Sequence, residues 1–221
     1  ANKALVLFVI AFLHDSTSTL NVSFFTSTKT GFRPSWIIGK SDVDHVTAGT
    51  RTSSPFSNFA GGPDDFGHFW GRSDNDELLD YNWVDIEGVG NIVSFPTNDM
   101  AGDPVELGFS FPFYGSEYTQ CIINPNGWVG FGNDNDAWDN TSIPSSAAPR
   151  PAIFGFWDDL NPINDNCNAD CAGNVYYHSN NERMVVWFND VAHWAGYFDN
   201  SIYNFQIILY STGEVKFNYN S

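Results

Sequence analysis

Basic residues are scarce in this 221-residue chain: nine Lys and Arg stand against 26 Asp and Glu, which gives a formal charge of −17. The charge is uneven, because residues 1–60 carry a net charge of +2 and the remaining residues carry −19. A negative field of this size repels phosphate backbones and anionic lipid. The composition therefore excludes nucleic acid and anionic membrane surfaces as partners, and it favours cations or a basic protein surface.

The chain also lacks an apolar run long enough to span a bilayer. Its main run, residues 4–13, has ten residues, whereas a membrane helix needs about 20. The run resembles part of a secretion signal, but no small-residue cleavage site follows it. Because it is apolar at both alternations, we predict a strand that is covered on both faces, with a retained signal remnant as the alternative. A second strand over 20–25 would complete an N-terminal hairpin.

Recognisable catalytic motifs are missing as well. The sequence contains neither a Gly-x-Ser-x-Gly elbow nor a His-Glu-x-x-His pair, and its five histidines are scattered. Asp158 and Asp159 are adjacent, so on a strand they would face opposite sides, unlike the two carboxylates of a glycosidase. We therefore predict that the protein is not an enzyme.

Cysteine is rare, with three residues in the whole chain. Cys167 and Cys171 share one short polar loop, and in an oxidising compartment we predict a disulfide between them, with two free thiols as the alternative. Cys121 stands alone in an apolar run. The loop offers too few ligands for a zinc site.

Aromatic residues, in contrast, are abundant: they make up 17% of the chain and recur at every second position. Such alternation, interrupted by Gly, Pro and Asn, is typical of antiparallel strands and turns. Strands are predicted over residues 81–86, 105–111, 118–123, 127–131, 152–157, 174–178, 184–189, 203–210 and 214–219. We predict an all-β fold, an antiparallel β-sandwich of jelly-roll type with an additional N-terminal strand or hairpin. The predicted division is an N-terminal segment, 1–62, whose residues 26–62 form a loop region, and an acidic sandwich domain, 63–221.

Several motifs follow one another in a recognisable order. Phe111-Pro-Phe-Tyr-Gly115 precedes Asn126-Gly-Trp-Val-Gly-Phe-Gly132, and Phe156-Trp-Asp-Asp-Leu160 comes next. Over residues 82–220 this order resembles the nidogen-like extracellular β-sandwich module, and in particular modules appended to bacterial secreted subtilisin-like proteases and surface proteins. The resemblance implies an extracellular or cell-surface location and a non-catalytic, structural or adhesive role.

One aspartate-rich loop is a candidate cation site. Asp134, Asp136 and Asp139 alternate with other residues there, and Asp158 and Asp159 could join them from a strand end. Hard cations such as calcium take oxygen ligands of this kind. Calcium is the one cofactor that the sequence suggests, and solvated turn acids are the alternative.

Two tryptophans and two asparagines complete the candidate sites. Trp138 and Trp194 have loop-like surroundings, so we predict that they are available to stack on a ligand, whereas the other tryptophans belong to strand patterns. Asn21 and Asn140 begin N-glycosylation sequons.

Two functional hypotheses follow. In the first, the protein is a self-assembling subunit of a surface filament or matrix, whose N-terminal strand pairs with a neighbouring copy. In the second, it is a monomeric module that binds glycan or another surface protein and belongs to a larger secreted protein or protease. Pairing of the N-terminal strand within its own sheet would favour the second hypothesis.

Overall fold

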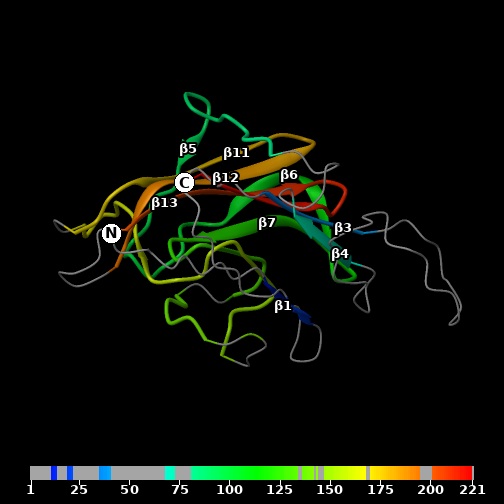
Figure 1. The fold of residues 1–221 in the computed structure, drawn as a ribbon, viewed down its shortest axis with the longest axis horizontal. Coiled ribbons are helices and arrows are strands. Elements are labelled where there is room, and N and C mark those ends of the chain that lie inside the picture. Colours follow the sequence, from blue (N-terminus) through cyan, green and yellow to red (C-terminus); the bar gives the residue numbers. More distant parts are fainter. Residues whose placement is uncertain are drawn as a thin grey trace, which may run out of the picture.

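The chain forms two antiparallel sheets that stack face to face (Figure 1). The computed structural model describes residues 11–13, 19–21, 35–40, 68–72, 81–133, 136–141, 143, 147–167, 170–194 and 201–220. All its regular elements are strands, and these segments include no helix that could cross a membrane. The predicted all-β sandwich is confirmed.

The first sheet has six strands. Their order across the sheet is β2 (Thr19–Asn21), β1 (Ala11–Leu13), β9 (Ala152–Phe154), β8 (Trp128–Gly130), β7 (Ser116–Asn124) and β6 (Val105–Phe113). β8 and β9 are short and fully buried, and β7 is buried where it ends. Trp128 of β8 and Phe154 of β9 pack against Ala137 of the aspartate-rich loop.

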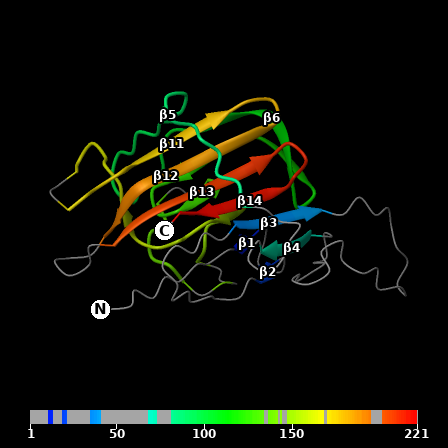
Figure 2. The same ribbon diagram turned by 45° about the horizontal axis from the view of Figure 1, so that its top comes forward.

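The second sheet contains eight strands, and Figure 2 shows β11, β12, β13, β14 and β3 side by side. Its order is β4 (His68–Arg72), β3 (Ser35–Lys40), β14 (Val215–Tyr219), β13 (Ile202–Tyr210), β12 (Arg183–His193), β11 (Asn174–Ser179) and β5 (Asn91–Ile92), and β10 (Leu160–Asn161) also pairs with β12. The predicted hairpin at Thr212–Gly213 joins β13 to β14, and the positive φ of Gly213 (88°) fits its turn.

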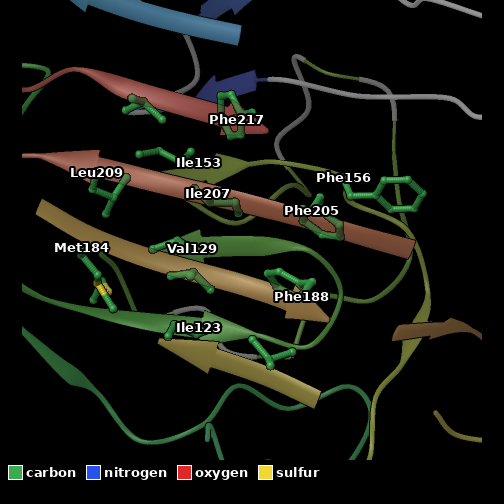
Figure 3. Close-up of a cluster of buried hydrophobic side chains, with 14 of the residues drawn as sticks. Ile123, Val129, Ile153, Phe156, Met184, Phe188, Phe205, Ile207, Leu209 and Phe217 are labelled. Atoms are coloured by element: carbon green, nitrogen blue, oxygen red, sulfur yellow. Dashed lines mark hydrogen bonds between the residues drawn. The ribbon is translucent and has the colours of Figure 1, made fainter. Parts of the chain in front are cut away.

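The core lies between the two sheets (Figure 3). The eight-stranded sheet contributes Met184, Phe188, Phe205, Ile207, Leu209 and Phe217, and the six-stranded sheet contributes Ile123, Val129 and Ile153. These side chains come from alternate positions of each strand, as the sequence pattern predicts. Phe188 and Phe205 are direct cross-strand partners whose rings stack with centroids 4.4 Å apart. Aromatic pairs of this kind stabilise a sheet beyond the area that they bury.

The described part of the N-terminal apolar run belongs to the chain's own sheet. β1 pairs with β9 through Ala11–Phe154 and Leu13–Ala152, and on its other side it pairs with β2. A hairpin is therefore present at β1 and β2, while residues 4–10 and 22–25 of the two predicted strands lie outside the described residues. This pairing is the arrangement that favours a binding module over strand donation.

Two sequence predictions need correction. Residues 81–86 have no strand geometry; the segment crosses the outer face of the eight-stranded sheet. The region 26–62 is not only loop, because β3 lies within it and pairs with β14. Strands β4, β5 and β10 were also missed, and two of these have only two residues.

Buried amide side chains hold the crossing segment in place. Gln206 accepts a hydrogen bond from Val84 N at 3.1 Å and donates one to Val84 O at 2.6 Å. Asn218, which is also fully buried, donates to Asn82 O at 2.8 Å. The segment then covers a second apolar cluster with Ile86. Side-chain amides thus replace the neighbouring strand that would otherwise satisfy this backbone.

We expect Gln206→Ala to lower the free energy of unfolding by about 2–3 kcal/mol, because the substitution leaves a part-buried N–H and C=O of Val84 without partners. Gln120→Ala is the matched control: Gln120 is exposed and its amide donates to Glu106, which is also exposed, so its loss should cost at most about 0.5 kcal/mol. Urea denaturation measures both values. Equal effects of the two substitutions would show that the amide does not hold the segment.

Candidate functional site

A buried asparagine turn between β7 and β8 organises the candidate site. Asn124 donates from Nδ2 to Asp99 O at 3.1 Å and accepts at Oδ1 from Asn126 N at 2.8 Å. Asn126 in turn accepts at Oδ1 from Leu160 N at 2.8 Å. The turn therefore connects two distant segments, which carry Asp99 and Asp159, through hydrogen bonds shielded from water.

Glycine at position 127 allows the site segment to approach this turn closely. Gly127 has a φ of 85°, and a Cβ there would lie 3.0 Å from both Phe156 Cβ and Trp157 N. Its carbonyl accepts hydrogen bonds from Gly155 N and Phe156 N. A side chain at this position would push residues 155–157 away, and with them the two aspartates that follow.

The loop of residues 136–141 lies against the same segment. Trp128 Nε1, at the start of β8, donates to Ala137 O at 3.0 Å. Asn140 Nδ2 lies 3.4 Å from both Trp157 O and Asp158 Oδ1. These contacts bring Asn140, which directly follows Asp139, next to Asp158.

The end of β12 closes the site on its other side. Trp194 N donates to Asp159 O at 2.8 Å, and His193 Nε2 lies 3.5 Å from Asp158 Oδ2. We call the surface formed by residues 136–141, Asp158, Asp159, His193 and Trp194 the aspartate face.

The negative charges of this face act on one another. Burial, the largest cause, raises the pKa of Asp159 to about 6, and Asp99, Asp158 and Asp139 raise it further, while His193 lowers it. The pKa of Asp99 is also raised, first by burial and then by Asp136. The carboxylates therefore share one electrostatic environment in which a positive charge or a hydrogen-bond donor would be stabilised.

Four of the five predicted calcium ligands lie on segments that contact one another. Asp136, Asp139, Asp158 and Asp159 all lie on the aspartate face, while Asp134 lies outside the described residues. Within the segments that the structure places, no three acidic, histidine or cysteine side chains converge closely enough to hold a metal ion. The calcium site stays a prediction.

Both predicted ligand-stacking tryptophans are on the surface. Trp138 is 47% exposed and Trp194 is 50% exposed, whereas Trp128 and Trp157 are buried in a satellite cluster beneath them. Each exposed indole belongs to a segment that is hydrogen-bonded to residues 157–159. The segments that carry the two exposed indoles thus both contact residues 157–159.

The remaining predicted sites lie outside the aspartate face or at its edge. The disulfide between Cys167 and Cys171 is present, with Cα atoms 5.9 Å apart, and Cys121 is buried with Sγ 3.6 Å from Met184 Sδ. Asn140 is exposed, as a glycosylation site requires, and it lies on the aspartate face. Asn21 ends β2. Glycosylation of both asparagines stays a prediction.

Sequence reasoning missed three contributors to the site. Asp99 lies between predicted strands, and Asn126 belongs to a turn motif that suggests no ligand. In the sequence, His193 is one of several scattered histidines. The Asn124-Pro-Asn-Gly127 turn was the available signal, because asparagine side chains in tight turns commonly bond to nearby backbone.

Comparison with known proteins identifies the fold family. The chain belongs to the nidogen-related (NIDO-related) domain family, whose model matches residues 79–221. It is a family of extracellular-type, non-enzymatic modules, and the match confirms the resemblance seen in the motifs. No curated protein and no solved structure matches the chain significantly. The matched segment contains the whole aspartate face.

We expect Asp159→Asn to stabilise the protein at neutral pH. The folded pKa of about 6 lies above the ordinary aspartate value of 3.8, so ionisation of Asp159 costs the folded state stability that returns as the pH falls through 6 toward 4. After allowance for partial exposure, the amide should add on the order of 1 kcal/mol at about pH 7.5 and nothing below about pH 4.

Thermal unfolding at several pH values measures this difference. Asp165→Asn removes the same charge from an exposed position outside the face, and we expect a change of at most about 0.5 kcal/mol. A lower melting temperature of Asp159→Asn at neutral pH would contradict the raised pKa of Asp159.

Proposed function

We propose that the chain is a non-catalytic binding module of an extracellular protein, and that it contacts its ligand through the aspartate face. The observation that carries the proposal is the exposure of Trp138 and Trp194 on two segments that meet at residues 157–159. Ligand-binding residues commonly lie on loops that a rigid scaffold positions. Here the scaffold is the sandwich, and the loops adjoin its buried asparagine turn.

Exposed indoles are well suited to recognition. Each offers a large apolar surface and a polar N–H at little conformational cost. A partner that covers both half-exposed tryptophans removes their apolar surface from water. Burial of that surface contributes favourable free energy to binding. The carboxylates beside them would give such a contact its direction and specificity.

The in-sheet pairing of β1 supports a module rather than a filament subunit. A donated strand would need its hydrogen-bonding edges free for a neighbouring copy, but β1 is paired on one side with β9 and on the other with β2. Only the charge difference between the first 60 residues and the rest still favours assembly. The binding module therefore replaces the filament as the preferred hypothesis.

Calcium is proposed as an accessory ligand of the same face. The carboxylates of Asp99, Asp139 and Asp158 all raise the pKa of Asp159, and a divalent cation among them would relieve their repulsion. Oxygen ligands supplied by carboxylates and water suit calcium better than transition metals.

Removal of calcium tests this accessory role. If calcium binds the folded state, excess EDTA should lower the melting temperature by several degrees and added calcium should restore it, because a ligand of the native state stabilises that state. Magnesium is the control cation. An unchanged melting curve would mean that the aspartates are ordinary solvated acids.

Surface retention tests the binding function. We expect the purified chain to bind immobilised desialylated mucin or an immobilised high-mannose glycoprotein, and Trp138→Ala with Trp194→Ala to weaken this binding at least about tenfold. Desialylated material is used because anionic sugars would be repelled by the negative charge of the chain. Biolayer interferometry measures the retention.

A matched double variant controls for loss of apolar surface. Val89 and Ile92 are 58% and 61% exposed and lie at β5, outside the aspartate face. Val89→Ala with Ile92→Ala should bind like the parent chain. If the two double variants lose binding equally, or if no coating retains the parent chain, the aspartate face is not the binding site.

A further inference from the structure

Two pairs of N-terminal strands extend the two sheets of the sandwich. β1 pairs with β9 and carries β2 beside it, and β3 pairs with β14 and carries β4 beside it (Figure 2). All four strands precede residue 79, where the match to the family model begins. Within the matched residues alone, β9 and β14 would be edge strands, each with one hydrogen-bonding side unpaired. We call the four added strands, β1 to β4, the cap.

The two edges that the cap covers lie against each other across the core. Ile153 of β9 and Phe217 of β14 belong to the same buried cluster (Figure 3). Tyr219 Oη, at the end of β14, donates to the carbonyl of Gly155 at 2.6 Å, and Gly155 follows β9 directly. A Cβ at Gly155 would lie 3.4 Å from Phe217 Cδ1. The cap therefore covers one continuous double edge, which consists of β9 in one sheet and β14 in the other.

This double edge is apolar. With the cap in place, Ala152, Ile153 and Phe154 of β9 are 0% exposed, and every residue of β14 is buried. An open edge of this kind would present unpaired backbone groups and apolar side chains to water. Strand pairing satisfies both needs, because the added strand supplies hydrogen bonds and covers the neighbouring side chains.

β4 adds side-chain anchors to this backbone pairing. Trp70 packs against the main core cluster, and His68 is only 7% exposed. The ring of His68 lies 4.7 Å from the ring of Tyr114, between their centroids, and Tyr114 lies in the turn between β6 and β7 of the other sheet. The cap thus contacts both sheets. Buried aromatic anchors of this kind commonly supply most of the free energy of a protein interface.

Charge favours the cap as the partner of this edge. Residues 1–72 contain six Lys and Arg and five Asp, a net charge of +1, whereas the remaining residues contain three Lys and Arg and 21 Asp and Glu, a net charge of −18. Opposite signs favour docking of the N-terminal part on the rest. Two matched domains that met edge to edge would each carry the negative charge and repel each other.

We propose that β9 and β14 form a strand-addition site for a pair of β-hairpins, and that the cap occupies this site within its own chain as a separable ligand. The site recognises backbone through strand pairing and an indole through the core contact of Trp70. A hairpin of neutral or basic charge from another polypeptide fits the same site once the cap leaves. The site consists of strand edges rather than the aspartate face, so this inference is independent of the proposed function.

Cleavage between the cap and the matched domain tests the proposal. A protease recognition sequence inserted between Asp76 and Glu77 leaves the whole chain present after cleavage, as two fragments. We expect the fragments to remain associated in size-exclusion chromatography. A fluorescent synthetic peptide of residues 35–72, which contains β3 and β4, should label the cleaved chain at least about tenfold more than the uncleaved chain, because an intact connection keeps the chain's own strands at a high effective concentration.

Two peptide variants separate the two parts of the recognition. Trp70→Ala removes the indole and keeps the backbone and the charge, and it should weaken labelling at least about tenfold. Ile37→Pro removes a backbone N–H in the middle of β3 and should weaken it as strongly, since proline is not accommodated inside a paired strand. A peptide of the same composition in scrambled order is the control, and it should leave the cleaved chain unlabelled.

Three results would overturn the proposal. The first is immediate separation of the fragments while the acidic fragment stays folded and monomeric, because the edges would then need no partner. The second is labelling only at urea concentrations that unfold the whole chain, measured by tryptophan fluorescence, because the N-terminal strands would then belong to a single cooperative core. The third is equal labelling by the scrambled peptide, which would show non-specific adsorption rather than strand addition.

Discussion

The buried turn from Asn124 to Gly127 is the constraint on which the candidate site depends. Two asparagine side chains and one glycine carbonyl hold segments that are far apart in the sequence, around Asp99 and around Asp159. In a buried setting such bonds are costly to lose, because no water replaces them. The aspartates can therefore repel one another without moving apart, since the backbone that carries them is fixed by neutral groups beneath.

The same strategy holds the outer face of the eight-stranded sheet. Gln206 and Asn218 are fully buried amides that bond to the backbone of residues 82–84. Amides suit this task because each carries both a donor and an acceptor and adds no charge to the interior. In a chain with 26 acidic residues, neutral amides place polar anchors inside the fold without adding to its repulsion.

Local sequence pattern was sufficient to predict most strands, because the residues of a sandwich strand alternate between its buried and its exposed side. β6, β7, β11 and β13 lie close to their predicted ranges. Elsewhere, hydrogen bonds between distant residues produce a structure that the local pattern does not predict. Residues 81–86 alternate like a strand, yet their backbone bonds to side chains 122 and 136 positions away. The loop aspartates and exposed tryptophans could be foreseen from their polar surroundings. Asp99 and His193 could not, because only the fold brings them to residues 158–159.

The scaffold of the site and its contact residues come from different parts of the sequence. Asn126, Gly127 and the Phe156–Leu160 segment belong to the motifs on which the sequence resemblance rests, and they fix the backbone. Trp138 and Trp194 lie outside those motifs, and their side chains are half exposed. Trp194 N donates to Asp159 O, and the segment of Trp138 is held through Ala137 O and the Asn140 side chain, so neither anchor uses an indole. The exposed residues of the face can therefore change without changing how the backbone beneath them is held.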